Sequence, residues 1–294
     1  MAMANNEAID LTGRVVLITG ANTGIGKATA ADLAGRGAEL ILACRSEAKA
    51  QPVIEELRAA SDNDAIDFLA LDLGDLASVR RAAAEVLAVD RPLHVLVNNA
   101  GLAGQRGQTT DGFELAFGTN HLGHFLFTTL LLDRLRSSAG PEVPARVVNV
   151  ASGSHFDAPG IDFDALQQST PSVVGMREYS VSKLANVLFT QQLAQRVDPA
   201  EVAMFATDPG PVHTDVWRRI PGPIYAVFRR VMRLKPVEAG AAPSVFCVTE
   251  PGLEAQSGAY VDEHCRIVPP SPVATPALGL ELWDRSEAWV RLDS

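Results

Sequence analysis

The stretch Thr19-Gly20-Ala21-Asn22-Thr23-Gly24-Ile25-Gly26 decides the fold of this chain. An apolar run at 14–18 leads into it, and an alanine-rich helical pattern at 25–36 follows it. Glycines let the backbone turn tightly and approach a pyrophosphate, while the start of the helix offers free N–H groups and the positive end of its dipole. In this strand–loop–helix context the stretch predicts a dinucleotide site, and the alternative is an ordinary glycine-rich turn.

The rest of the chain repeats this alternation of apolar runs and helical patterns. Further strands are expected at 38–44, 66–71, 93–97, 146–150, 202–207 and 259–261, and helices at 47–60, 76–89, 118–136, 179–196 and 275–290. Continuous apolar runs are typical of parallel strands that are buried on both faces. The sequence therefore predicts an α/β fold with a single doubly wound (Rossmann) domain over 1–294. Its parallel sheet should have about seven strands, with helices on both faces and ligand sites at the carboxyl ends of the strands.

The composition limits the classes of protein and of partner. The chain has 294 residues, 47% of them hydrophobic, and its formal net charge of −10 argues against nucleic acid as a partner. Residues 1–10 are polar and expected to be flexible, and no apolar run is long enough to cross a bilayer, so we expect a cytoplasmic protein. Three widely spaced cysteines without a Cys-x-x-Cys pair argue against a disulfide framework and a zinc site, and no metal is expected.

Arg45 ends the second expected strand, at the place that usually selects between NAD and NADP. An acidic side chain there would bind the ribose hydroxyls, whereas an arginine favours the 2′-phosphate. The strand ends Ala43-Cys44-Arg45 without a carboxylate, and the planar guanidinium of arginine pairs well with phosphate. The sequence predicts NADP(H) in preference to NAD(H), and the alternative is a solvated surface arginine.

Tyr179 and Lys183 are four residues apart on an expected helix, so they lie on one helical face. A nearby ammonium favours the phenolate, and we expect it to lower the pKa of Tyr179 from its ordinary value of about 10. Tyr179 could then exchange a proton with a substrate oxygen near neutral pH. Ser152 follows the strand at 146–150 and is expected to hydrogen-bond the same oxygen, with Ser154 as the rival candidate.

The glycine loop (Gly-x-x-x-Gly-x-Gly), Asn98-Asn99-Ala100-Gly101 and Tyr-x-x-x-Lys together resemble the short-chain dehydrogenase/reductase family. The resemblance implies a catalytic set of Asn120, Ser152, Tyr179 and Lys183, in which Asn120 bends its helix and Lys183 also holds the nicotinamide ribose. His121 and His124 are interpreted as structural. Asp72 matches an adenine contact of the family, but it could instead cap the next helix, for which Asp75 is also available.

The cofactor-binding residues follow from the glycine loop, from Arg45 and from this resemblance. They are Gly20, Asn22, Thr23, Gly24, Ile25, Gly26, Arg45, Asp72, Leu73, Asn99, Ala100, Gly101, Tyr179, Lys183, Pro209, Gly210, Val212 and Thr214.

Further stretches resemble the retinol dehydrogenase-like branch of the family. They lie at 43–45, 119–125, 182–190, 258–260 and 282–283. The chain departs from the family's pattern at Asp208, where His or Asn is common. It also departs at Ala151, where a serine is usual, and no N-terminal membrane anchor of the retinol type is expected.

The segment 214–236 is expected to form a lid over the substrate. Its part at 217–235 is amphipathic and carries six Lys or Arg side chains with no acidic one. The alternatives are a docking surface for an anionic substrate or lipid, which would give peripheral membrane contact, and a partner interface.

The sequence thus predicts an NADP(H)-dependent oxidoreductase that interconverts an alcohol and a carbonyl. The substrate is expected to be a small, lipophilic alcohol, aldehyde or ketone, and Tyr179 is expected to be the general acid/base. The alternative is an NADP(H)-binding sensor or interaction module with little turnover. The resemblance implies a homodimer or homotetramer formed through two long helices.

Overall fold

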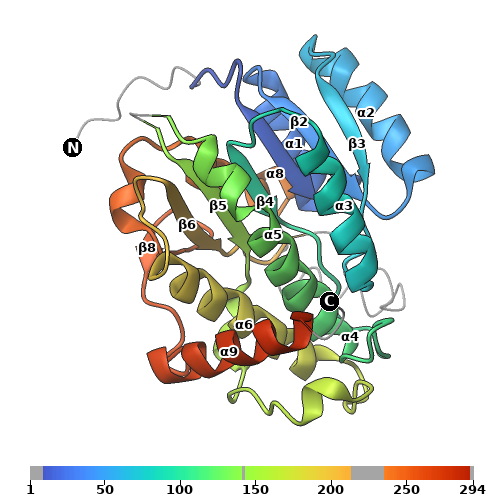
Figure 1. Cartoon of the computed structure of the whole chain (residues 1–294), viewed down its shortest axis with the longest axis vertical. Helices are drawn as coiled ribbons and strands as arrows, with labels where there is room; N and C mark the ends of the chain where they lie inside the picture. Colours follow the sequence, from blue (N-terminus) through green and yellow to red (C-terminus); the bar gives the residue numbers. More distant parts are fainter. Residues whose placement is uncertain (1–8, 141–142, 213–234, 292–294) are drawn as a thin grey trace.

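One eight-stranded sheet forms the centre of the chain, for which the computed structural model describes residues 9–140, 143–212 and 235–291 (Figure 1). The strand order is β3-β2-β1-β4-β5-β6-β7-β8. The strands are β1 (Val15–Thr19), β2 (Glu39–Cys44), β3 (Ile66–Ala70), β4 (Val95–Asn98), β5 (Ala145–Val150), β6 (Val202–Thr207), β7 (Tyr260–Val261) and β8 (Ile267–Val268). The order reverses direction between β1 and β4, which is the switch point where doubly wound folds bind ligands.

The last strand corrects the expected count and direction of the strands. β8 pairs antiparallel with β7, whereas the other neighbouring pairs are parallel. β8 has only two residues, Ile267 and Val268, of which Ile267 is exposed, so it is too short to show the pattern of a buried strand in the sequence.

Helices cover both faces of the sheet (Figure 1). They are α1 (Gly24–Gly35), α2 (Glu47–Ser61), α3 (Leu76–Ala88), α4 (Leu115–Phe117), α5 (Gly123–Ser137), α6 (Met176–Ala194), α8 (Val237–Thr249) and α9 (Pro276–Arg291). The helix expected at 118–136 is interrupted, because its first turn, Gly118–Leu122, is π-helical. Helix α8 was not expected at all, since Gly240 and Pro243 both disfavour a helix interior.

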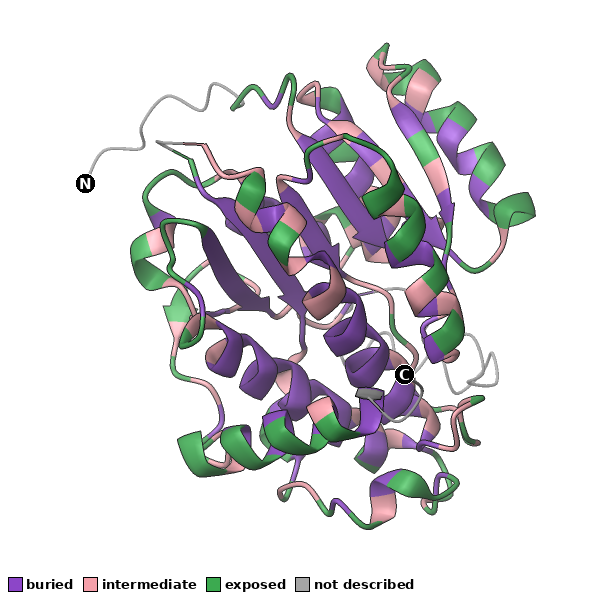
Figure 2. Cartoon of the chain, viewed as in Figure 1, coloured by how far each residue is buried: buried purple, intermediate pink, exposed green. Residues whose placement is uncertain are grey.

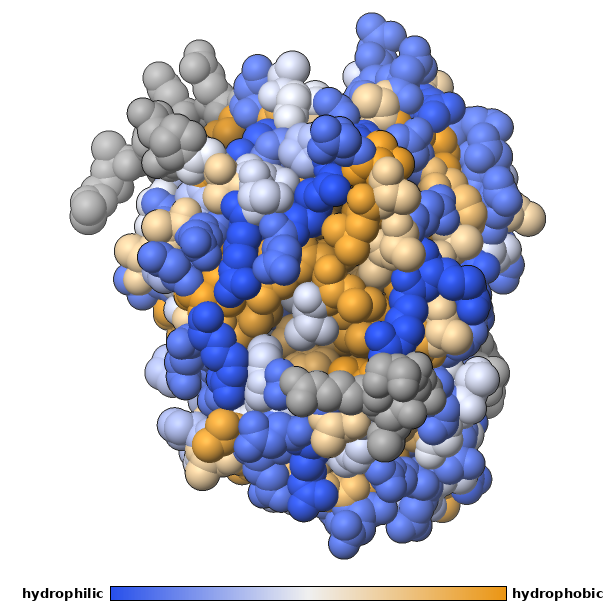
Figure 3. All heavy atoms as spheres, in the orientation of Figure 1, coloured by the Kyte–Doolittle hydropathy of each residue, from blue (hydrophilic) through white to orange (hydrophobic). Residues whose placement is uncertain are grey.

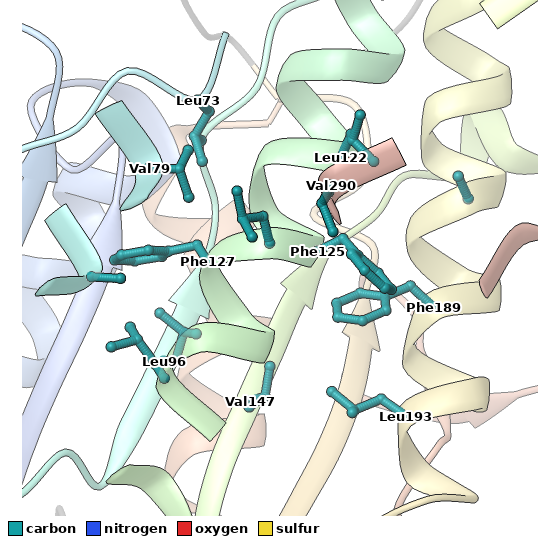
Figure 4. Close-up of a cluster of buried hydrophobic side chains, with 14 of the residues drawn as sticks. Leu73, Val79, Leu96, Leu122, Phe125, Phe127, Val147, Phe189, Leu193 and Val290 are labelled. Atoms are coloured by element: carbon teal, nitrogen blue, oxygen red, sulfur yellow. The ribbon is translucent and has the colours of Figure 1, made fainter. Parts of the chain in front are cut away.

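Alternate residues of β1 enter two separate hydrophobic cores. Val15 and Leu17 face the core shared with α3, α5, α6 and α9, and Val16 and Ile18 face the core shared with α1, α2 and α8. Side chains of successive strand residues point to opposite faces, so a strand covered on both sides must be apolar throughout. Figure 4 shows how Phe125 and Phe189 fill the first of these cores between α5 and α6.

Helix α9 lies across the outer face of α6 (Figure 1). Trp283 of α9 packs edge-on against Phe125, with ring centroids 5.1 Å apart, and stacks on Phe189 at 6.0 Å. The Arg196 guanidinium lies 4.2 Å from the centre of the Trp283 ring. Helix α6 is therefore almost wholly buried inside one chain, while the outer face of α9 is exposed (Figure 2).

Hydrophobic side chains also reach the surface on this side of the molecule. Figure 3 shows them gathered in a hollow near the centre of the view, over the region where α5 crosses the sheet. Leu130 and Leu132 of α5 are only half-buried. None of the helices in the described part of the chain is both long and apolar enough to span a membrane.

Candidate active site

The glycine loop lies between the end of β1 and the start of α1, as the sequence predicts. Gly20 has a φ of +67°, and a Cβ there would come within 2.8 Å of the Cα of Ala100. A Cβ on Gly26 would come within 2.4 Å of the side-chain nitrogen of Asn99. Only glycine fits both positions, because the backbone of the loop lies directly against the residues that follow β4.

The loop after β4 is tied to the end of β1 by one threonine. The backbone N–H groups of Asn99 and Ala100 both donate to the Thr19 hydroxyl at 2.9 Å. The Asn99 side chain donates to the Thr19 carbonyl at 2.8 Å. Residues 99–101 and the glycine loop therefore form one rigid platform.

His124 joins this platform to Asn120. Its Nδ1 lies 2.9 Å from the Asn120 carbonyl and its Nε2 lies 2.9 Å from the Thr19 hydroxyl. A carbonyl can only accept, so Nδ1 carries the proton and Nε2 accepts from Thr19. Burial lowers the pKa of His124 to about 4, which keeps the ring neutral at pH 7. These contacts agree with the interpretation of His124 as structural, although sequence spacing did not show which two residues it connects.

The Asn120 side chain holds two other segments in place. Its Oδ1 accepts from the backbone N–H of Leu102, and its Nδ2 donates to the Leu102 carbonyl and to the Ser182 hydroxyl, each at 2.9 Å. A Cβ on Gly101 would lie 3.4 Å from Asn120 Oδ1 and 3.6 Å from Lys183 Nζ, so the three residues are neighbours. The π-helical turn that contains Asn120 is of the kind often found at functional sites.

Tyr179, Lys183 and Ser152 meet at the carboxyl end of β5. Lys183 Nζ donates to the Val150 carbonyl at 2.7 Å and lies 5.7 Å from the centre of the Tyr179 ring. The side chain of Ser152 lies close enough to the Tyr179 phenol to lower its pKa. Ser154, the rival candidate, instead donates its backbone N–H to the Ser152 hydroxyl at 3.2 Å. The geometry favours Ser152 as the partner of Tyr179.

The pKa of Tyr179 differs from the expectation. Burial raises the pKa of this phenol to about 12; the nearby Ser152 hydroxyl opposes the rise, and the negative charge of Asp208 adds to it. Burial also lowers the pKa of Lys183 to about 8, against the opposing effect of Asp208. The predicted fall in the pKa of Tyr179 is therefore wrong for the protein alone, because removing the phenolate from water has the largest effect.

The remaining cofactor candidates lie around the same edge of the sheet. Asn22, Thr23 and Gly24 form the turn into α1, with Thr23 as the residue that precedes the helix. Ile25 and Val212 both lie close to Gly240, since a Cβ there would come within 3.3 Å of both side chains.

Asp75 settles which carboxylate caps α3. Its side chain accepts from the backbone N–H of Ala77 at 2.9 Å, which leaves Asp72 to accept from Gly74 in the preceding turn. The side chain of Leu73 is buried in the core (Figure 4), so a cofactor contact there would come from its backbone.

The Pro-Gly turn after β6 is held by Asp208. The backbone N–H of Gly210, next to Pro209, donates to Asp208 Oδ1 at 2.8 Å. The described residues do not include Thr214 or most of the expected lid at 214–236. Of the basic segment at 217–235 they include only Lys235. No group of His, Cys, Asp or Glu in the described ranges is arranged to hold a metal ion.

Comparison with known proteins settles the family. A sequence profile described as short chain dehydrogenase matches residues 14–163. Retinol dehydrogenase 12 of Homo sapiens is 43% identical over 258 residues, which cover 87% of this chain and 79% of that protein. The chain belongs to the short-chain dehydrogenase family.

Other short-chain dehydrogenases show how far the similarity extends. Dehydrogenase/reductase SDR family member 13 of Homo sapiens is 39% identical, over 95% of this chain and 73% of its own. The crystal structure of an uncharacterised protein of Mycobacterium paratuberculosis is 30% identical, with a TM-score of 0.78, and covers 99% of this chain and 98% of its own. As a short-chain dehydrogenase of the retinol dehydrogenase-like branch, the protein is an oxidoreductase that acts on CH–OH or C=O groups.

Proposed function

We propose that this short-chain dehydrogenase uses NADP(H) and that Tyr179 is its general acid/base. The observation that carries the proposal is the assembly of Ser152, Tyr179 and Lys183 at one edge of the sheet, directly beside the glycine loop. This edge is where doubly wound folds bind dinucleotides. A bound nicotinamide would supply or accept the hydride at the substrate carbon.

The residues present fit a dinucleotide. Gly20 and Gly26 leave a cradle that a Cβ would fill, and α1 begins at Gly24 with its free N–H groups directed to the same loop. A Cβ on Gly101 would lie 3.6 Å from Lys183 Nζ, so the ammonium lies against the loop that follows β4. This position supports a role for Lys183 in holding the ribose next to the nicotinamide.

Arg45 supports the preference for NADP(H). Its side chain is exposed at the carboxyl end of β2 and forms no ion pair within the described residues. The N-terminus of α2 begins two residues later, and the Ser46 side chain that precedes it makes no capping hydrogen bond. A guanidinium, a free hydroxyl and a helix N-terminus together suit a 2′-phosphate.

Tyr179 can supply the proton for reduction of a carbonyl. Burial raises its pKa to about 12, so it is a neutral phenol at pH 7 and can donate its proton to the oxygen that receives negative charge. The Ser152 hydroxyl, near the phenol, can stabilise the same oxygen. Asn120 does not touch the phenol and acts through the residues it holds in place.

The substrate that fits best is a small lipophilic aldehyde or ketone, with the matching alcohol as its product. The names of the retinol dehydrogenases to which the chain is similar support this class. The exposed ring of Phe156 is also available for such a substrate, because it lies next to His155, three residues beyond Ser152.

The assembly and location of the protein are also proposals. Helix α9 already covers the outer face of α6, so a homodimer or homotetramer would form through other surfaces, such as the hollow over α5 in Figure 3. The protein is proposed to work in the cytoplasm.

Replacement of the proposed acid tests the function. Tyr179→Phe is expected to lower kcat for aldehyde reduction by a factor of about 10² to 10⁴, since that is the usual contribution of a general acid. NADPH affinity, measured by calorimetry, is expected to stay within about twofold of wild type. A tenfold weaker affinity would require the loss of contacts worth about 1.4 kcal/mol.

Tyr260→Phe is the matched control, because it removes another phenol near the site and should keep turnover. Undiminished turnover in Tyr179→Phe would contradict the mechanism. NADPH binding without turnover on any carbonyl by the wild-type protein would instead favour the sensor or interaction module.

A further inference from the structure

His155 is a buried histidine close to the proposed catalytic serine. It lies in the short 3₁₀ turn Gly153–Asp157, which follows Ser152, and it is 0% exposed. Its ring packs against the rings of Phe156 and Tyr260, with centroids 4.1 Å and 4.7 Å away. The imidazole is therefore enclosed by protein, and its two nitrogens have to find their hydrogen-bond partners there.

The Ser152 carbonyl receives two hydrogen bonds from this one residue. The backbone N–H of His155 donates to it at 3.0 Å, and the ring Nδ1 lies 2.7 Å from the same oxygen. The two bonds fix the peptide group that follows Ser152, and with it the direction in which the serine side chain leaves the backbone. The Ser152 Oγ accepts from the backbone N–H of Ser154 at 3.2 Å, so its own proton can point to a substrate oxygen.

The other ring nitrogen of His155 reaches a distant part of the chain. Nε2 lies 3.0 Å from the backbone nitrogen of Ser271, a buried residue in the connection from β8 to α9. On its other side the serine follows Ala151, whose N–H donates to the Thr207 carbonyl of β6 at 2.8 Å. Ser152 is thus held between the sheet and an imidazole that is itself anchored 116 residues further along the chain.

The two partners determine which nitrogen of the ring carries the proton. A carbonyl can only accept, so Nδ1 is protonated, and a backbone N–H can only donate, so Nε2 is not. The neutral Nδ1–H form is therefore the one that satisfies both contacts. Burial lowers the pKa of His155, against the opposing negative charges of Asp208 and Asp157, which agrees with a neutral ring at pH 7.

We propose that His155 is a positioning residue, whose Nδ1–H holds the Ser152 carbonyl and so directs the serine hydroxyl to the substrate oxygen. The inference rests on the proposed function and adds the residue that orients its serine. A donor stabilises developing charge best from a fixed position, and a displacement of about 1 Å can cost about a hundredfold in rate. The bond to Ser271 keeps the ring in place and its Nε2 unprotonated.

Two substitutions separate the two hydrogen bonds of the ring. The amide nitrogen of His155→Asn can take the place of Nδ1 and donate to Ser152, whereas the longer side chain of His155→Gln places its amide at Nε2 and can reach only Ser271. We expect His155→Gln to lower kcat for aldehyde reduction by about 10- to 100-fold, with KM and NADPH affinity little changed. His155→Asn should keep kcat within about threefold of wild type, because it retains the bond to the carbonyl. Equal kcat values for the two variants would overturn the proposal.

His94→Gln is the matched control, because His94 also hydrogen-bonds a backbone group, the N–H of Val15, but at the opposite end of the strands. Its kcat should equal that of wild type. The Ser152→Ala background then shows whether His155 acts through the serine. In that background His155→Gln should lower kcat no further, because the effects of residues that act together are not additive. The same loss in both backgrounds would refute the positioning role.

Failure of the proposed function would give a different result. If Ser152→Ala reduces aldehydes as fast as wild type, the role of the serine itself is refuted. Nitrogen NMR of the ring needs no turnover, and among the six histidines the His155 signals are identified by their loss in His155→Gln. At pH 7 we expect the neutral Nδ1–H form. A charged ring or an Nε2–H form would overturn the inference even if the protein reduces no carbonyl.

Discussion

Replacing Trp283 by alanine should loosen helix α9 from the body of the protein. Trp283 is only 8% exposed, and it packs against Phe125, Phe189 and the Arg196 guanidinium. Removing a buried Trp or Phe ring costs about 3–5 kcal/mol of unfolding free energy. The loss of two aromatic pairs and of a cation–π contact places this site toward the upper part of that range.

The expected change in melting temperature follows from the size of the protein. An unfolding entropy of about 2.1 cal/mol/K per residue gives roughly 0.6 kcal/mol/K for the 294-residue chain. A loss of about 3–5 kcal/mol then lowers Tm by about 5–8 °C, which calorimetry or circular dichroism can measure.

Leu280→Ala is the matched control for this measurement. Leu280 lies on the same helix, but its side chain is 49% exposed, so its removal should change stability by no more than about 0.5 kcal/mol. Equal Tm values for Trp283→Ala and Leu280→Ala would refute the packing of α9 on α6.

Acidification is expected to destabilise the fold below about pH 6.5, because burial lowers the pKa of His121 to about 3 and that of His124 to about 4. The unfolded chain takes up protons that the folded chain does not, so stability falls with pH by about 1.4 kcal/mol per unit for each histidine until the folded pKa is reached. Urea denaturation midpoints that agree at pH 7 and pH 5 would contradict this. Arg45→Asp is expected to lower the NADPH/NADH ratio of kcat/KM by at least about tenfold, because it reverses the charge at the proposed phosphate site. The exposed Arg81→Asp on α3 is the control, and an unchanged ratio in Arg45→Asp would argue against that site.

The sequence predicted the parts of the fold whose patterns are local. The strands from β1 to β6 lie within two residues of their predicted positions, because each contains a short apolar run in the sequence. β3 is the exception to burial on both faces, since Asp67 and Ala70 are exposed. Helix α8 and strand β8 were missed, since Pro243, Gly240 and a two-residue strand depend on neighbouring elements for their conformation.

The candidate site shows the same division between local and long-range effects. Tyr179 and Lys183 were found from their spacing, which is a property of one helix. The direction of the pKa change of Tyr179 was not predicted correctly, because it depends on burial by distant segments and on Asp208. Asp208 was noticed only as a departure from a family pattern, and its contacts with Gly210 and Tyr260 were visible only in the folded chain.

The link from Thr19 through His124 to Asn120 has a consequence for the thermodynamics of ligand binding. The Thr19 hydroxyl accepts two backbone N–H groups and donates to His124, so its hydrogen-bonding capacity is filled before any ligand arrives. Because these side chains have no free rotamers to lose, the protein loses little conformational entropy on binding. Most of the entropy loss then comes from ordering the dinucleotide. We therefore expect the dinucleotide to bind a preformed site, with backbone shifts of less than about 1 Å around Thr19 and Asn120.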